Sequence, residues 1–188
     1  MRLPRLAILF LMVLAILGVM TPASAGASPY CGIPWGSLPK SHHGQGDGPS
    51  DEWLDDVRAG RHACFDRLVV DLGWATGFDA YDVRYVSQVS EDGSAQAAAL
   101  RGGADLQIVL PANPYDSRGR THYAPPDRSE LVDVSGFQTF RQVAWAGALE
   151  GETTLGLGTR ARLPFRVFIL PGPDLGQQRV VIDVAHRW

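Results

Sequence analysis

The sequence has little lysine and little cysteine. Lys40 is the single lysine among 17 basic residues, and Cys31 and Cys64 are the only two cysteines. Two cysteines are too few for a small scaffold that depends on a disulfide framework. The preference for arginine over lysine, with many alanines and glycines, is typical of a bacterial genome rich in G and C. A hydrophobic content of 45% excludes a disordered charged tail and a collagen-like repeat, and 188 residues favour one domain of ordinary size.

Motifs of catalysis and metal binding are missing from the sequence. It contains no G-x-S-x-G, H-E-x-x-H or P-loop motif, and Gly156–Gly158 is only a fragment of a dinucleotide fingerprint. No C-x-x-C pair occurs, and the adjacent His42 and His43 lack a third metal ligand with suitable spacing. We therefore expect a protein that is not an enzyme and that needs neither a cofactor nor a metal.

The one long apolar run lies at the N-terminus. Arg2 and Arg5 precede the run Leu6–Met20, Pro22 ends it, and Ala23–Ala25 supplies the small residues of a cleavage site. This three-part pattern is typical of a secretory signal peptide, and the run is short for a spanning helix, which needs about 20 residues. We expect residues 1–25 to be removed on export, with no stable membrane span afterwards; an uncleaved anchor is the alternative.

Export changes both the charge and the state of the cysteines. Residues 1–25 contain two arginines and no acidic residue, so the mature chain would carry a net charge of −5 with neutral histidines. A net acidic chain is a poor partner for nucleic acid or an anionic membrane. Outside the cytoplasm, Cys31 and Cys64 most simply form one disulfide; a redox pair or a metal site is the alternative.

An irregular N-terminal segment, residues 26–52, would be tied by this disulfide to a domain over residues 53–188. Proline and glycine interrupt every period in the segment, and residues 41–48 are expected to form a flexible linker. Trp35 and Leu38 are its only large apolar groups near the middle, and we expect both to dock beside the first cysteine.

From residue 53 onward, short runs of alternating apolar and polar residues are separated by turn signals. The pattern predicts eight strands: Trp53–Arg58, Cys64–Leu72, Tyr81–Val86, Leu106–Leu110, Gln142–Ala148, Thr153–Leu157, Phe165–Leu170 and Arg179–Ala185. Short strands with regular turns are typical of an all-β antiparallel sandwich or barrel. Little helix is expected, although Ser94–Leu100 has the propensity for one or two helical turns.

Two of the predicted strands resemble each other. Arg67–Leu72 and Arg179–Val184 both read R-h-h-h-D-h, where h is apolar. Alternation predicts inward side chains for Leu68, Val70, Leu72, Val180, Ile182 and Val184. If the strands are antiparallel neighbours, Arg67 can pair with Asp183, and Asp71 with Arg179. The simpler interpretation is that these charges lie on a solvated face, where ion pairs contribute little.

Residues 111–128 form the least regular internal stretch and carry Tyr115 and Tyr123. A long loop of this kind is either functional or mobile. Aromatic faces can stack on sugar rings, so Tyr115 and Tyr123 are our candidate ligand-binding residues. Trp74, Trp145 and Trp188 are further aromatic candidates, of which Trp145 is expected to be partly buried.

Two groups of motifs resemble the AMIN-like domains of bacterial, mostly actinobacterial, secreted proteins and lipoproteins. Val57–His62 followed by Phe65–Leu72 is similar to the start of these domains, and Pro164–Phe168 followed by Arg179–His186 is similar to their end. The resemblance covers roughly residues 53–187. It implies a β-sandwich with two related halves and a relation to AMIN domains, which target amidases and secretion channels to the cell envelope.

The proposed ligand of AMIN domains is peptidoglycan, and the resemblance carries over no binding or catalytic residues. It implies a secreted, extracytoplasmic, non-enzymatic domain of the cell envelope that binds peptidoglycan or another glycan. Two alternatives remain open: a protein–protein interaction module of an envelope assembly, and a carrier of a small apolar ligand. An enclosed apolar cavity would favour the carrier, a shallow aromatic groove the glycan, and a flat apolar patch the protein partner.

Overall fold

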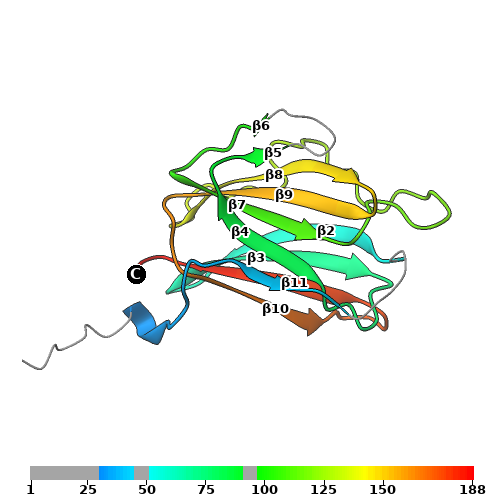
Figure 1. Cartoon of the computed structure of the whole chain (residues 1–188), viewed down its shortest axis with the longest axis horizontal. Helices are drawn as coiled ribbons and strands as arrows, with labels where there is room; N and C mark the ends of the chain where they lie inside the picture. Colours follow the sequence, from blue (N-terminus) through cyan, green and yellow to red (C-terminus); the bar gives the residue numbers. More distant parts are fainter. Residues whose placement is uncertain (1–29, 45–50, 91–96) are drawn as a thin grey trace, which may run out of the picture.

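Two antiparallel sheets pack face to face and form a β-sandwich, as the two layers of Figure 1 show. The computed structural model describes residues 30–44, 51–90 and 97–188. The expected signal peptide, residues 1–25, lies outside these ranges. The all-β sandwich predicted from the alternating pattern is confirmed.

The larger sheet has five strands in the spatial order β1 (Lys40–His42), β4 (Tyr81–Val86), β7 (Ala104–Leu110), β9 (Glu152–Thr159) and β8 (Phe140–Leu149). The second sheet has four, in the order β10 (Phe165–Pro171), β11 (Gln178–Ala185), β3 (Phe65–Gly73) and β2 (Trp53–Arg61). A separate pair consists of β5 (Val89–Ser90) and β6 (Ala97–Ala98). Within the described ranges, the only helical element is the 3-10 turn η1 (Tyr30–Gly32).

All eight strands predicted from the sequence are present, and their ends differ from the prediction by three residues or fewer. Two local expectations were wrong. Ala97–Ala98, inside the segment with helical propensity, pairs with β5 as a strand because cross-strand hydrogen bonding outweighs a weak local preference; residues 94–96 lie outside the described ranges. Ser41 and His42, expected in a flexible linker, belong to β1, which pairs with the edge of β4.

The core lies between the sheets, and the alternation in the two similar strands predicted its composition correctly. The six side chains expected to point inward are all fully buried: Leu68, Val70, Leu72, Val180, Ile182 and Val184. Buried residues of the opposite sheet, among them Leu106, Ile108, Leu155 and Leu157, belong to the same core cluster. Burial of aliphatic side chains on this scale is the main stabilising contribution to such a fold.

The similar strands β3 and β11 are antiparallel neighbours, with Arg67 opposite Asp183 and Asp71 opposite Arg179. Arg67 donates two hydrogen bonds to the Asp183 carboxylate, at 2.6 and 2.9 Å, and Asp183 is fully buried. This pair is therefore not on a solvated face. Asp71 instead accepts two hydrogen bonds from Arg58 on β2, at 2.6 and 2.8 Å.

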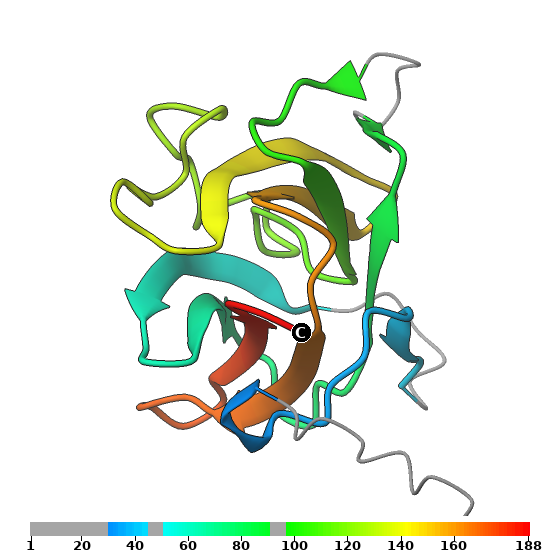
Figure 2. The same ribbon diagram turned by 90° about the vertical axis from the view of Figure 1, so that its left-hand side faces the viewer.

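The part of the N-terminal segment around Trp35 packs on the outer face of the second sheet, where β3 and β10 begin. A disulfide joins Cys31 to Cys64, and the Trp35 ring lies 5.6 Å from that of Phe65. The Arg166 guanidinium of β10 lies 4.4 Å above the Trp35 ring, and Figure 2 shows the segment in blue beside β10. The expected docking of Trp35 is confirmed. That of Leu38 was wrong, because its side chain is 70% exposed.

Candidate functional site

An open groove lies at the end of the sandwich where β3 ends and β2 begins. Its volume is about 340 Å³, and it is lined by Asp51, Trp53, Trp74, Asp116, Ser117, Arg118 and Arg120. One wall comes from the ends of β2 and β3. The other comes from the loop of residues 111–128, which follows β7 and extends from the same end of the molecule in Figure 1.

Trp74, directly after β3, is the most exposed aromatic group of the groove. Its side chain is 68% exposed, and its φ angle is +50°, a region that bulky residues rarely adopt. The backbone is fixed there because Ala75 N donates a 2.6 Å hydrogen bond to the carbonyl of Gly176 in the β10–β11 turn. Strained backbone of this kind is concentrated at ligand sites, since packing alone gives no reason to keep it.

Trp53, the first residue of β2, forms the floor beside it. The Trp53 ring lies against Gly73, where an added Cβ would come within 2.2 Å of the indole nitrogen, so glycine is required for this packing. On its other side the indole stacks on His122, with 4.1 Å between ring centroids and 19° between planes. The ring is thus held in place between the sheet and the loop.

The loop itself is organised around the Asp116 carboxylate. One oxygen accepts the backbone N–H groups of Arg118 and Arg120, at 3.0 and 2.9 Å. The other accepts the Arg120 side chain at 3.2 Å and His122 Nε2 at 3.1 Å. These bonds favour the ionised carboxylate, and the hydrogen bond from His122 contributes most; together they lower the pKa of Asp116 to about 2.

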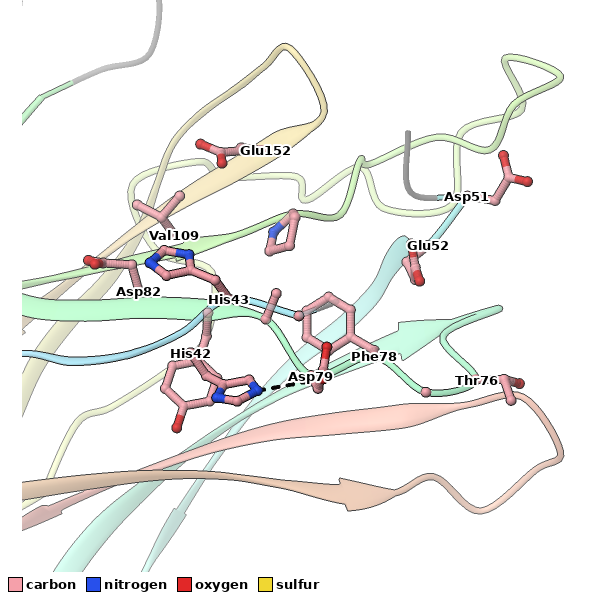
Figure 3. A pocket seen from close by; sticks show the side chains of 15 residues that line it. His42, His43, Asp51, Glu52, Thr76, Phe78, Asp79, Asp82, Val109 and Glu152 are labelled. Carbon is pink, nitrogen blue, oxygen red and sulfur yellow. Dashed lines mark ion pairs between the residues drawn. The ribbon is translucent and has the colours of Figure 1, made fainter. Parts of the chain in front are cut away.

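A second hollow, of about 540 Å³, opens beside β1 and β4 and is shown in Figure 3. His42 forms an ion pair with Asp79 at 3.5 Å. Further carboxylates of Glu52, Asp82 and Glu152 line the hollow, but in Figure 3 they point in different directions and do not converge on one point. Within the described ranges, no group of three histidine, cysteine or acidic side chains could hold a metal ion.

The family model of the AMIN-like domain matches residues 52–186. The chain belongs to the AMIN-like domain family. The match includes the groove residues Trp53, Trp74 and Asp116, whereas Cys31 lies outside it. No curated protein and no solved structure matches the chain.

Membership of the AMIN-like family is consistent with a module associated with the cell envelope. Within residues 30–44, 51–90 and 97–188, no helix combines the length and the apolar character that crossing a membrane requires.

The two tyrosines predicted as ligand-binding residues of the AMIN-like domain lie in different surroundings. Tyr115 is 49% exposed and forms an isolated antiparallel bridge with Thr121, directly beside the groove. Tyr123 is half-buried and stacks on Trp145, with 5.6 Å between centroids. Burial, with a smaller effect from the negative charge of Asp56, raises the pKa of Tyr123 to about 12. The Tyr115 side chain is therefore exposed to solvent, whereas the Tyr123 ring already has an aromatic neighbour.

Sequence analysis singled out Trp74 among the aromatic candidates but missed the charged wall of the groove. Asp116, Arg118 and Arg120 lie in the irregular stretch of residues 111–128, in which we selected only Tyr115 and Tyr123 as candidates. The available signal was the spacing of Asp116 from the N–H groups two and four residues later, which is typical of an aspartate that caps its own turn.

Proposed function

We propose that this protein is a non-enzymatic binding module of the cell envelope that holds a glycan, such as peptidoglycan, in the groove beside Trp74. The observation that supports this most directly is the Trp74 ring. It is held exposed on a strained backbone, opposite a loop of polar and charged side chains. A sugar presents an apolar C–H face and a rim of hydroxyl groups, so it fits one aromatic wall and one polar wall.

The polar wall has donors to offer such a ligand. Within the described ranges, no hydrogen bond or ion pair involves the guanidinium of Arg118, and Ser117 lies next to it in the groove. Arg118 therefore has side-chain N–H groups available for sugar hydroxyls, and a guanidinium can donate up to five hydrogen bonds. Tyr115, adjacent to Asp116, offers a second exposed ring beyond the groove wall.

The Asp116 carboxylate of the groove is not suited to act as the acid in hydrolysis of a glycosidic bond. Both oxygens of Asp116 accept hydrogen bonds from its own loop, and its lowered pKa keeps it from acting as a proton donor near neutral pH. A glycosidase needs a protonated acid facing a second carboxylate across the bond. This supports binding without catalysis.

Nothing in the core favours an apolar carrier. The space between the sheets is filled by fully buried side chains, among them Phe140, Phe165 and Leu106. The groove, in contrast, is lined largely by polar side chains. A protein partner remains the interpretation to adopt if the glycan test fails.

The test is retention of the mature protein on insoluble peptidoglycan. Trp74→Ala is expected to weaken retention by about two- to twelvefold, since an aromatic stacking contact is worth about 0.5–1.5 kcal/mol. Trp188→Ala is the matched control, because Trp188 is 67% exposed but follows the last strand, at the opposite end of the sandwich. Tyr115→Ala should weaken retention as well, and the double variant with Tyr123→Ala tests both predicted tyrosines.

Circular dichroism should show that every variant keeps the strand signal of the wild type. The loss of retention caused by Trp74→Ala should change little with salt, because stacking on a sugar ring does not depend on charge. Equal retention of Trp74→Ala and Trp188→Ala would exclude the groove. If the wild type itself is not retained, the glycan proposal fails.

A further inference from the structure

Four arginines gather at the end of the sandwich opposite the groove, where β2 and β11 end and β8 begins; Figure 2 faces this end. They are Arg61, Arg141, Arg160 and Arg187, which we call the arginine cluster. Arg61 lines a hollow of about 400 Å³, and the other three line a second hollow of about 380 Å³. Gln138 lines both hollows, so they adjoin.

The charges of the arginine cluster are not neutralised by the part of the chain that the structure describes. No carboxylate there forms an ion pair with any of the four guanidinium groups, whereas Arg58, Arg67 and Arg101 each pair with one. The full chain has a net charge of −3, so the positive charge concentrated at this end is opposite in sign to the charge of the whole protein. Such a local field attracts anions.

Backbone carbonyls, which carry no net charge, hold two of these side chains in place. Arg141 donates to the carbonyl oxygens of Phe140 at 2.8 Å and Phe137 at 3.2 Å. Arg160 donates to the carbonyl of His186 at 2.6 Å. These bonds orient the guanidinium groups, keep their full positive charge and leave further N–H donors free.

The single carboxylate that lines the two hollows is already satisfied. Asp66 accepts hydrogen bonds from Thr139 N at 2.6 Å, Phe140 N at 3.2 Å and His186 Nε2 at 3.1 Å. It is fully buried and has no bond to the arginine cluster. His186 is 2% exposed, and its Nδ1 atom has no hydrogen-bond partner. The hollow that Arg141, Arg160 and Arg187 line is thus bordered by three guanidinium groups and the buried His186 ring, and no described carboxylate lines it.

We propose that the arginine cluster binds an oxyanion, a carboxylate or phosphate group carried by the ligand. The planar guanidinium matches two oxygens of either group, and hydrogen bonds between two charged partners are about twice as strong as neutral ones. The site is independent of the groove at the other end of the sandwich. A polymer that carries both sugars and anionic groups can therefore be held at two separate points.

The experiment titrates the mature protein with inorganic phosphate and, separately, with citrate. Sodium chloride keeps the ionic strength constant, and isothermal calorimetry measures the affinity. Arg160→Gln and Arg187→Gln are each expected to weaken binding by about tenfold, the effect of losing one charge-assisted hydrogen bond. Arg179→Gln is the matched control. Arg179 is at the start of β11, away from the arginine cluster, and forms an ion pair with no described carboxylate. Like Arg160, it donates hydrogen bonds to a backbone carbonyl, which is that of Pro171.

Inorganic phosphate stands for a phosphate group and citrate for a carboxylate group. The probe that binds with the higher affinity identifies the oxyanion that the cluster prefers. Arg187 forms no hydrogen bond to the described backbone, so Arg187→Gln tests the proposal even if Arg160→Gln disturbs the fold. Equal affinities of wild type and both cluster variants would overturn the proposal, as would absence of binding by the wild type. Trp74→Ala should bind phosphate normally, so failure of the groove and failure of this site are separate results.

Discussion

The carboxylate of Asp66 on β3 and the imidazole of His186, directly after β11, form a buried pair with 3.1 Å between Oδ1 and Nε2. The second oxygen of Asp66 accepts the backbone N–H groups of Thr139 and Phe140, where β8 of the other sheet begins. One side chain therefore connects both layers of the sandwich. Buried polar groups are stable only when they are hydrogen-bonded, and Asp66 leaves neither oxygen unpaired.

Asp66→Ala should lower the free energy of unfolding by about 3–5 kcal/mol, because it leaves three buried hydrogen-bond donors, Thr139 N, Phe140 N and His186 Nε2, without an acceptor. Asp71→Ala is the control on the same strand: its partner, Arg58, is half-exposed, so the expected loss is below about 1 kcal/mol. Urea unfolding followed by circular dichroism measures both. Equal losses in the two variants would show that the buried pair does not join the sheets energetically.

The disulfide between Cys31 and Cys64 closes a loop of 33 residues around the docked N-terminal segment. Replacing both cysteines with serine should destabilise the protein by about 3–4 kcal/mol in the chain-entropy model. Thermal unfolding of the double variant, compared with the oxidised wild type, gives the shift. Mass spectrometry after alkylation without reduction should find no free thiol in the wild type. An unchanged melting temperature would contradict the expectation.

Val70 points into the core from β3, and its neighbour Val69 points to the opposite, partly exposed face. Val70→Asp should prevent folding, since it would bury an unpaired charge. Val69→Asp introduces the same charge one residue away and should leave a folded protein. Far-ultraviolet circular dichroism and solubility distinguish them. A folded Val70→Asp variant would show that the core face of β3 had been misassigned.

Sequence alternation was enough to predict the eight longer strands and the core, because both depend on a repeat of two residues that is visible along one segment; it missed the short strands β1, β5 and β6. The similarity of Arg67–Leu72 to Arg179–Val184 offered the register that places Arg67 opposite Asp183 as one alternative, and the simpler interpretation, a solvated face for these charges, was wrong for this pair. It did not predict that Asp71 would pair with Arg58, since that choice depends on β2 being the other neighbour of β3 in the sheet. Sheet order is a tertiary property that no local pattern encodes.

The groove and the arginine cluster were beyond sequence reasoning for the same reason. Trp53, Trp74 and Asp116 come from three separated segments, and the Trp74 φ angle leaves no trace in the residue type. Arg61 and Arg187 are far apart in the chain and lie at the same end of the sandwich only because β2 and β11 end on the same side. A chain with 16 arginines offers no reason to single out these two before the sheets are assembled.

The last prediction concerns the pH dependence of the groove loop. Asp116 has a folded pKa of about 2, below its ordinary value of 3.8, so its ionised form stabilises the folded loop. This contribution is fully present above about pH 4 and is lost as the pH falls through about 2. Asp116→Asn lacks it at every pH. The stability difference between wild type and variant, measured by urea unfolding from pH 7 down to pH 2.5, should therefore shrink below pH 4.

Tryptophan fluorescence should report the same change, because His122, a hydrogen-bond partner of Asp116, stacks on Trp53. A difference that stays constant across this range would show that the carboxylate charge does not hold the loop.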